Sequence, residues 1–412
     1  MNNGRRVNRL PVFMPNLFAI LALLTLTAAP VDNPGPVRIG LFSLLKPEIL
    51  EARVAAGAGA RLNANGLQAA SIKPNEFIRI RQSGARLNVA ILDSFGRVKQ
   101  AVTAREAEVV PAEASTLELN LPGKVRRVVR GRVSVVATHG PMRIVLVTDR
   151  ESAVASMVAA ELGGARQAEA LKALAVVVRT FLLSHGARHQ SEGFDFCDTT
   201  HCQLYRGESD LSAEAASPVV TSAVAQTAGE VLRYGGRVIE GYYSAVCGGL
   251  SNTPEMVWGG ASASGYPYHR VPCRWCHESS YYEWERAAAA SQVLNALSPA
   301  LKARLSQSAE IIVESDRPGD FVRSVVVRDR GGQSRLSADE FRRAVGRRLG
   351  WSTVLSPTFE IRRRGDRFIF RGRGFGSQVG LCQAGAIAQA AAGRGYREIL
   401  KFYYPQAEIT LH

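Results

Sequence analysis

FDFCDTTHCQLY, residues 194–205, places two thiols and an imidazole within six positions of the chain. Cys197, His201 and Cys202 are ligands that zinc accepts, and one further donor would complete a tetrahedral shell. His189 is the nearest candidate for that donor in the sequence. A closed site of this kind would fix the loop that carries it.

Two other arrangements of these residues remain open. Cys197 and Cys202 can form a disulfide, or they can be two buried thiols with His201 hydrogen-bonded nearby. The spacing also differs from that of a common zinc finger, whose histidines follow the cysteines well downstream. The pattern alone therefore does not separate a metal site from its alternatives.

A helical pattern precedes this stretch. From Ser152 onward, apolar residues recur at three- and four-residue steps, which indicates an amphipathic helix with a buried stripe. The stripe consists of Ala168, Leu171, Leu174, Ala175, Val178, Phe181 and Leu182. Glu169, Lys172 and Arg179 lie on the opposite face.

Glu161 stands just before this helical segment, among apolar neighbours. Desolvation would raise the pKa of its carboxyl and keep a proton available near neutral pH, as a general acid requires. Alternatively, Glu161 caps the following helix, whose N-terminal dipole would hold the carboxylate ionised. Composition alone favours the capping interpretation.

The N-terminus has the features of an export signal. Three arginines precede an apolar run at 17–29, which ends on two alanines small enough for a peptidase site. We predict that residues 1–31 are a signal peptide or an N-terminal anchor, and the prolines in the uncharged stretch favour cleavage. The remaining chain is expected in the periplasm or cell envelope, in contact with a membrane only through an uncleaved anchor.

The 412-residue chain is strongly basic, with a formal net charge of +15 and 44 arginines against 7 lysines. This balance fits polyanionic partners such as nucleic acid, anionic lipid or the carboxylate-bearing cell wall, and export argues against nucleic acid. It can equally reflect an arginine-rich solvated surface. Six arginines at 362–373 alternate with apolar residues, which predicts strand structure with arginines along an exposed face.

All six cysteines lie in the second half of the chain: Cys197, Cys202, Cys247, Cys273, Cys276 and Cys382. In an exported protein, cysteines ordinarily form disulfides because the compartment is oxidising. The Cys273-Arg-Trp-Cys276 element can be a redox motif, half of a second metal site or a local disulfide. We expect a disulfide that involves at least one residue of this pair.

The distribution of strand and helix patterns predicts an α+β fold. Short β-branched runs make a strand-rich N-terminal region at 36–150, with strands expected at 37–42, 77–82, 87–92, 129–137 and 142–148. A mixed α/β domain follows at 151–412. It contains an expected hairpin at 231–249 about Gly235 and Gly236, and expected helices at 291–305 and 337–351, the second opened by a capping box of Ser337 and Glu340.

A glycine-rich turn at 372–380 precedes the last helical stretch. Its backbone amides and Arg373 lie ahead of a helix, an arrangement that can bind an anion or let a sugar approach the main chain. It is no P-loop, because the Lys-Ser/Thr pair is missing. The aromatic residues of the Tyr242-Tyr243-Ser244 run and Trp258 are candidate platforms for a sugar ring, although such residues more often belong to a core.

The ordered series of motifs resembles the stage II sporulation protein D (SpoIID) family, which includes the amidase enhancer LytB. The resemblance covers about residues 150–410 and rests on Glu161 with EALKALAVVVRTF, then GFDFCDTTHCQLYRG, SAVCGG, FRRAVGRRLGW, GRGFG, VGLCQAGA and YREILKFYYP. It implies a SpoIID-like domain that acts on peptidoglycan glycan strands. The N-terminal region, from VRIGL onward, also resembles the segment that usually precedes this domain.

The resemblance also implies specific roles. The sporulation members are lytic transglycosylases, and Glu161 matches their catalytic glutamate. A protonated Glu161 would donate to the glycosidic oxygen, and its carboxylate would then deprotonate the C6 hydroxyl of the muramic acid, closing a 1,6-anhydro ring without water. The zinc ligands match His189, Cys197, His201 and Cys202, and this zinc would be structural because four protein ligands leave no open position. The substrate-binding positions match Arg373, Gly374, Gly376 and Gln383.

The sequence departs from the family pattern at several places. Leu162 is followed by Gly163 where proline is common, Ser377 replaces the histidine of the GRGxGHG turn, and Cys382 stands where serine is usual. The missing histidine adds weight to a second hypothesis, that of a noncatalytic wall-binding module that activates a cell-wall N-acetylmuramoyl-L-alanine amidase. A third hypothesis is a zinc-stabilised secreted scaffold without glycan affinity.

Overall fold

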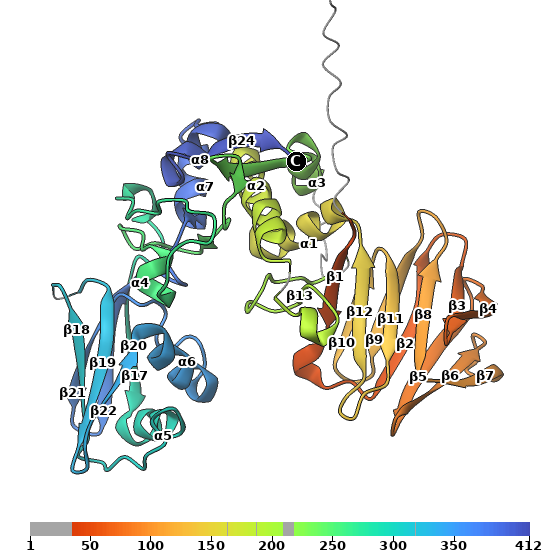
Figure 1. The fold of residues 1–412 in the computed structure, drawn as a ribbon, viewed down its shortest axis with the longest axis horizontal. Coiled ribbons are helices and arrows are strands. Elements are labelled where there is room, and N and C mark those ends of the chain that lie inside the picture. Colours follow the sequence, from red (N-terminus) through yellow and green to blue (C-terminus); the bar gives the residue numbers. More distant parts are fainter. Residues whose placement is uncertain (1–34, 163, 187, 209–217, 318) are drawn as a thin grey trace, which may run out of the picture. The chain divides into compact units, whose positions relative to one another are not determined.

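The computed structural model describes residues 35–162, 164–186, 188–208, 218–317 and 319–412 (Figure 1). The chain divides into two compact units, Met1–Asn33 and Pro34–His412, and the described residues belong to the second. The predicted export signal at 1–31 and Gly163 lie outside the described residues. Within the described part, no helix has the length and apolar character needed to cross a membrane.

Two sheets form the first part of this unit (Figure 1). The first contains, in spatial order, β13 (Phe196–Cys197), β1 (Val37–Leu41), β12 (Arg143–Thr148), β11 (Arg132–Val136), β8 (Glu106–Pro111), β3 (Ala60–Ala64) and β4 (Leu67–Ile72). The second contains β10 (Val125–Val129), β9 (Thr116–Leu121), β2 (Ile49–Ala56), β5 (Phe77–Ser83), β6 (Arg86–Leu92) and β7 (Val98–Ala104). Apolar residues of both sheets enter one core, and the predicted strand-rich N-terminal region is confirmed.

This core continues past residue 150 into two helices, α1 (Arg150–Leu162) and α2 (Ala168–Ser184). The expected apolar stripe of α2 is buried except for Ala168 at its start, and most of the other surface of the helix is buried too. Arg179, which the helical pattern placed opposite the stripe, has only 1% of its side chain exposed and pairs with Glu151. The helix is therefore surrounded by protein, and its one buried cation is neutralised by a carboxylate.

A second core lies between α2 and the elements at the C-terminal end of the chain. Its elements are β14 (Glu230–Tyr234), β15 (Arg237–Val238), β16 (Tyr243–Ser244), β23 (Leu381–Cys382), α7 (Gln383–Ala391), α8 (Tyr396–Tyr403) and β24 (Glu408–Leu411). The helix α3 (Pro218–Gln226) packs into the first core instead, and α4 (Pro254–Trp258) contributes Val257 to a small separate cluster. The hairpin expected about Gly235 and Gly236 is formed by β14 and β15. The expected disulfide at Cys273 or Cys276 is wrong, because both are free, buried thiols.

Residues 283–373 form a third core of their own. It is built from β17 (Glu283–Ala289), α5 (Ala290–Leu301), β18 (Glu310–Ser315), β19 (Val322–Asp329), β20 (Gly332–Ser337), α6 (Ala338–Leu349), β21 (Phe359–Arg364) and β22 (Arg367–Arg373). Glu283 pairs with Arg373, so this segment begins and ends at adjacent positions. The capping box of Ser337 and Glu340 is confirmed, as are the predicted α+β class and the exposed arginines of β21 and β22.

Candidate functional site

Glu161 lies in the last turn of α1, where its carboxyl faces residues from distant parts of the chain. The Gln383 side-chain amide, at the start of α7, donates a hydrogen bond of 3.0 Å from Nε2 to Oε2 of Glu161. The N-cap of the following helix α2 is Gln167, so Glu161 does not cap that helix. The capping interpretation is therefore wrong, and Glu161 is at the negative end of its own helix dipole.

The surroundings of Glu161 raise the pKa of its carboxyl. Burial is the largest cause, and the hydrogen bonds from Gln383 and Tyr243 and the positive charge of Arg206 oppose it with smaller effects. Because burial disfavours the charged form, the balance keeps a proton on the carboxyl at higher pH than for an exposed glutamate. This is the environment expected of a general acid.

Tyr243 connects Glu161 to the loop that carries the predicted metal ligands. Its hydroxyl donates a 2.6 Å hydrogen bond to Oε1 of Gln203, which is 3% exposed, and it also contacts the Glu161 carboxyl. Burial raises the pKa of Tyr243 well above its usual value, so the phenol stays neutral. When Glu161 is protonated, the phenol oxygen can accept a hydrogen bond from it while the phenol proton is donated to Gln203.

Sequence reasoning missed two members of this network, Gln203 and Arg206, and expected Tyr243 to be a sugar platform. The available signal was adjacency, because Gln203 directly follows the predicted ligand Cys202. Its neighbour Tyr242 fits the expected platform better. It packs against Trp258 with ring centroids 5.0 Å apart, and Trp258 is 46% exposed.

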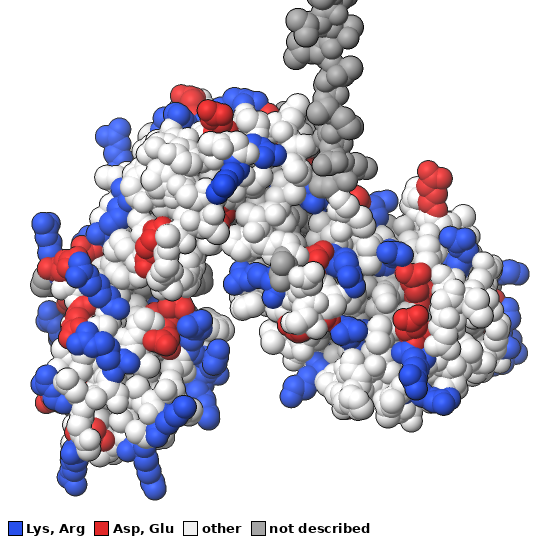
Figure 2. Space-filling view, viewed as in Figure 1, with Lys and Arg blue, Asp and Glu red and all other residues white. Residues whose placement is uncertain are grey.

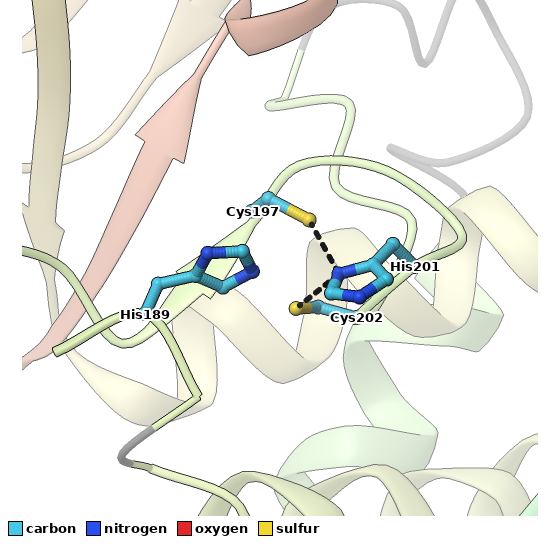
Figure 3. A group of neighbouring side chains, drawn as sticks. All are labelled: His189, Cys197, His201 and Cys202. Atoms are coloured by element: carbon cyan, nitrogen blue, oxygen red, sulfur yellow. Dashed lines mark hydrogen bonds between the residues drawn. The ribbon is translucent and has the colours of Figure 1, made fainter. Parts of the chain in front are cut away.

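The four predicted metal ligands come together in the structure. Their ligand atoms all lie within 4.8 Å of one another, from His189, Cys197, His201 and Cys202. Figure 3 shows the two imidazoles and the two thiols directed towards one another, with His201 Nδ1 3.7 Å from Cys197 Sγ and 3.6 Å from Cys202 Sγ. Both cysteines are free thiols, so the alternative Cys197–Cys202 disulfide is not formed.

His189 provides an independent sign that this group fits a metal ion. Its Nε2 atom is buried and has no hydrogen-bond partner in the described part of the chain. Its other ring nitrogen, Nδ1, lies 2.5 Å from a carboxylate oxygen of Glu192. Histidines that bind metals commonly have their second nitrogen held in this way, which leaves the first free as a ligand. The residues can therefore hold a metal ion in a closed shell of four protein ligands.

The first sheet fixes the loop that carries these ligands. β13 pairs in parallel with β1, and a Cβ at Gly40 in β1 would approach the Phe194 ring to 2.7 Å, so only glycine allows this contact. Asp198, buried next to the ligand Cys197, accepts hydrogen bonds from the Phe42 amide at 2.8 Å and from the Arg127 guanidinium at 2.5 Å. The loop that carries the predicted metal ligands is thus tied to the two N-terminal sheets on one side and to the Glu161 network on the other.

The glycine-rich turn has a different role from the one expected. The amide of Gly374 donates to the carbonyl of Tyr281 at 2.9 Å, and that of Gly376 donates to the carbonyl of Leu355 at 3.0 Å. Gly374 is itself buried. Because these amides already have partners inside the protein, the expectation that they bind an anion is wrong.

Gln378 holds this turn together. It occupies the place of the last glycine in the GRGxGHG pattern and has a left-handed φ of 64°. Its side-chain amide donates to the carbonyls of Cys247 and Arg373 at 2.8 and 3.0 Å, and accepts from Asn252 and Thr358 at 3.0 and 2.7 Å. Four hydrogen bonds offset the cost of the left-handed backbone, which is about 1–2 kcal/mol for a residue with a Cβ. These hydrogen bonds fix the turn on which Ser377 stands at the position of the histidine.

The structure separates the four expected substrate positions. Gln383 is buried and contacts Glu161, whereas Arg373 is exposed and pairs with Glu283 at 3.2 Å. Gly374 is internal, and a Cβ at Gly376 would approach Ser244 Oγ to 2.6 Å. The two glycines thus allow the turn to pack closely against β16, the strand that carries Tyr243.

Comparisons with known proteins agree with the motif order. Residues 138–234 match the SpoIID family, described as stage II sporulation protein. An uncharacterized protein of Brachyspira hyodysenteriae is 30% identical over 243 residues, which cover 59% of this chain and 61% of that protein. Stage II sporulation protein D of Bacillus subtilis is 29% identical over 63% of this chain and 74% of its own length.

The amidase enhancer of Bacillus subtilis is also similar, with 27% identity over 59% of this chain and 38% of its own length. The matched region thus spans about three fifths of the Brachyspira protein and a smaller share of the amidase enhancer. The family match, the named relatives and the order of the motifs thus support a place in the SpoIID family for the matched region of the chain.

Proposed function

We propose that this chain is an exported lytic transglycosylase that cleaves the glycan strands of peptidoglycan, with Glu161 as its general acid and base. Membership of the SpoIID family supports a role at the cell wall. The observation that carries the catalytic proposal is the largely buried Glu161 carboxyl, whose pKa is raised by burial although its hydrogen bonds with Gln383 and Tyr243 oppose that shift.

In the proposed reaction, one carboxyl serves both steps. Protonated Glu161 donates its proton to the glycosidic oxygen as the bond between that oxygen and the anomeric carbon of muramic acid breaks. The C6 hydroxyl oxygen of the same sugar then bonds to the anomeric carbon, and its proton returns to Glu161. The products are a free sugar hydroxyl and a 1,6-anhydro ring, and no water is consumed.

The neighbours of Glu161 have distinct tasks in this scheme. The Gln383 amide fixes the orientation of Oε2 and stabilises the carboxylate formed between the two steps. While Glu161 is protonated, the neutral Tyr243 hydroxyl can accept a hydrogen bond from its carboxyl, because the phenol proton is donated to Gln203. Arg206 supplies the positive charge that limits how far burial raises the pKa of Glu161.

The metal in this proposal is a structural zinc. Two thiolates and two imidazoles form a common zinc shell, and His189, Cys197, His201 and Cys202 would fill all four positions. The ligand loop ends at Gln203, so holding this loop in place positions Tyr243 against Glu161.

Substrate contacts are proposed for Gln383 beside Glu161, for the exposed Arg373, and for the face formed by Trp258 and Tyr242. Arginine suits the carboxylates of the wall peptides, and aromatic rings suit the faces of sugar rings. Figure 2 shows Lys and Arg side chains distributed over the visible surface, with several on the part that holds β21 and β22. These features fit an envelope protein that binds an anionic wall rather than nucleic acid.

The test is the release of anhydro-muramyl products from peptide-free glycan strands. The mature protein should release them, Glu161→Gln should not, and Glu113→Gln should match the wild type because Glu113 is exposed on the strand-rich region. Circular dichroism and metal content should show that Glu161→Gln is folded. Equal product from the wild type and Glu161→Gln would overturn the catalytic role.

A second candidate is a noncatalytic activator of a cell-wall amidase, which the name of the amidase enhancer suggests for this chain. The observation that favours it is Ser377, which stands in place of the motif histidine. This function predicts binding to glycan without turnover, and equal stimulation of an N-acetylmuramoyl-L-alanine amidase by the wild type and by Glu161→Gln.

A further inference from the structure

A second group of metal-ligating side chains lies away from the predicted zinc site. Cys247 follows β16, Cys273 and Cys276 flank a single 3₁₀ turn (η3, Arg274–Cys276), and Cys382 ends β23. Their four sulfur atoms lie within 4.8 Å of one another, and all four residues are buried free thiols. Cys247 and Cys382 are 135 positions apart in the sequence, so the fold brings cysteines from distant segments together.

We propose that Cys247, Cys273, Cys276 and Cys382 form a second, structural zinc site with four thiolate ligands. At a zinc–sulfur distance of about 2.3 Å, the sulfurs of a tetrahedral site lie about 3.8 Å apart. The Sγ atoms of Cys247 and Cys276 are 3.5 Å apart, and no pair in the group exceeds 4.8 Å. These separations fit a single tetrahedral ion. They are too long for bonded sulfurs, which lie about 2.05 Å apart.

The surroundings of the sulfurs suit thiolates. Cys382 Sγ accepts hydrogen bonds from the backbone amides of Cys247 and Gly385, each at 3.3 Å. Cys382 is also the N-cap of α7, where the positive end of the helix dipole faces its sulfur. The Tyr403 hydroxyl lies 3.4 Å from Cys273 Sγ. Amide donors and a helix N-terminus favour the deprotonated form that zinc requires.

Local geometry supports a site for an ion rather than a packed apolar core. Cys273 and Cys276 are separated by two residues on one tight turn, which is the usual spacing of a ligand pair in structural zinc sites. A Cβ at Gly385 would lie 2.2 Å from Tyr403 Oη and 3.0 Å from Cys273 Sγ, so glycine is needed to keep the space beside the sulfurs. Four protein ligands would leave no position for water, so the ion would have a structural role.

The cluster lies beside the residues that contact Glu161. Cys382 pairs with Ser244 across β16 and β23, next to Tyr243, and the residue after Cys382 is Gln383. The ion would join the loop at 259–282 to the two segments that present the partners of Glu161. The metal site itself does not depend on the proposed reaction, because its evidence is the four thiols and their surroundings.

Metal analysis of the full mature chain, expressed with export and purified without chelator, tests the proposal. The wild type should contain about two zinc ions per chain, by the four-ligand count of a structural site. Cys382→Ser and Cys202→Ser should each lower the content to about one, and the double variant to about zero. Serine is usual at position 382 in the family, so Cys382→Ser should fold, and circular dichroism checks this.

Two further measurements identify the ligands. In Cys202→Ser protein loaded with cobalt(II), the remaining ion should show the intense thiolate-to-cobalt absorption of a four-thiolate site, and this band should disappear in the double variant. Alkylation of the denatured wild type with chelator and without reductant should modify all six cysteines. One zinc per chain in the wild type, or cysteines among these four that resist alkylation because they are disulfide-bonded, would overturn the proposal.

Discussion

Cys382 and Gln383 are consecutive residues that belong to two different sites. Cys382 Sγ is part of the four-cysteine cluster, and Gln383 Nε2 donates the 3.0 Å hydrogen bond to Glu161. The same relationship recurs at Cys202, a member of the predicted metal site, which is followed by Gln203, the partner of Tyr243. Each glutamine of the Glu161 network is thus held in place by a neighbouring cysteine cluster, so loss of either cluster should disturb Glu161.

Replacing Glu161 with glutamine should make the protein more stable at neutral pH. Burial raises the pKa of this carboxyl above its unfolded value, so the folded state binds more protons than the unfolded state between the two values. Below the pKa that Glu161 has in the unfolded chain, its carboxyl is neutral and the cost of a buried charge is absent. As the pH rises through the pKa of Glu161 in the folded protein, the carboxyl ionises and this cost lowers the stability. Urea unfolding should show Glu161→Gln gaining stability at pH 7 over the wild type.

The same comparison at pH 4 provides the control, because both proteins then carry a neutral side chain at position 161. The gain should shrink there, while Glu113→Gln, at an exposed position, should show little change at either pH. A constant gain across this range would contradict a raised pKa for Glu161.

Replacing Gln383 with leucine should lower activity and shift its pH dependence. The amide stabilises the carboxylate form of Glu161, so its loss raises the pKa of Glu161 further. The alkaline limb of the pH profile for kcat/KM should move to higher pH, and kcat should fall by about tenfold, as expected for the loss of one hydrogen bond to a charged group that contributes about 1.5 kcal/mol. Gln226→Leu, on the exposed face of α3, is the matched control.

A fall in kcat without any movement of the alkaline limb would show that Gln383 acts only on substrate. A glycan-binding measurement with an uncleaved strand separates these cases, because the pKa effect on Glu161 predicts little change in affinity.

Replacing Glu151 with alanine should destabilise the protein by about 3–5 kcal/mol, because it leaves the buried Arg179 guanidinium unpaired. Glu151 accepts hydrogen bonds from Nε and one terminal nitrogen of Arg179, both at 2.7 Å, and Arg179 is 1% exposed. Arg179→Met should cost less, because it leaves only the 40% exposed Glu151, which water can solvate. Urea midpoints at constant m-value measure both.

Glu118→Ala is the control for this comparison. Its partner Arg53 is 53% exposed at a distance of 2.8 Å, so the loss should be about 1 kcal/mol or less. If Glu151→Ala and Glu118→Ala lower the free energy of unfolding equally, water solvates the Arg179 guanidinium, and the prediction of a costly buried charge is wrong.

Local patterns in the sequence predicted the features that depend on short spacings. Three such features are the capping box at Ser337, the hairpin at Gly235 and the group of predicted metal ligands around Cys197. Each lies within a short segment of the chain, where turn geometry and side-chain spacing determine which side chains can contact one another. The alternation of arginines and apolar residues similarly predicted β21 and β22.

The features that sequence reasoning missed depend on contacts between distant segments. Gln383 and Glu161, which form a hydrogen bond, are 222 positions apart in the sequence. Burial of Arg179 depends on its ion pair with Glu151, which lies on another helix. The amides of Gly374 and Gly376 point inward because carbonyls from two other segments accept from them. For the same reason, the sequence pattern indicated only the neighbouring pair Cys273 and Cys276, and not the group that these residues form with Cys247 and Cys382.

Removing the metal from the site at Cys197 should lower stability and activity together. Without an ion, His189 Nε2 stays buried without a partner, and the loop that ends at Gln203 loses its attachment to the imidazoles and thiols. His201→Ala should therefore contain less zinc, unfold at a temperature lower by several degrees, and lose most of its transglycosylase activity because Tyr243 is no longer held against Glu161. Chelation of the wild type followed by addition of zinc should reverse both effects, whereas His277→Ala, at an exposed position, should behave as the wild type. If His201→Ala loses zinc but keeps full activity, the metal loop does not position the Glu161 network.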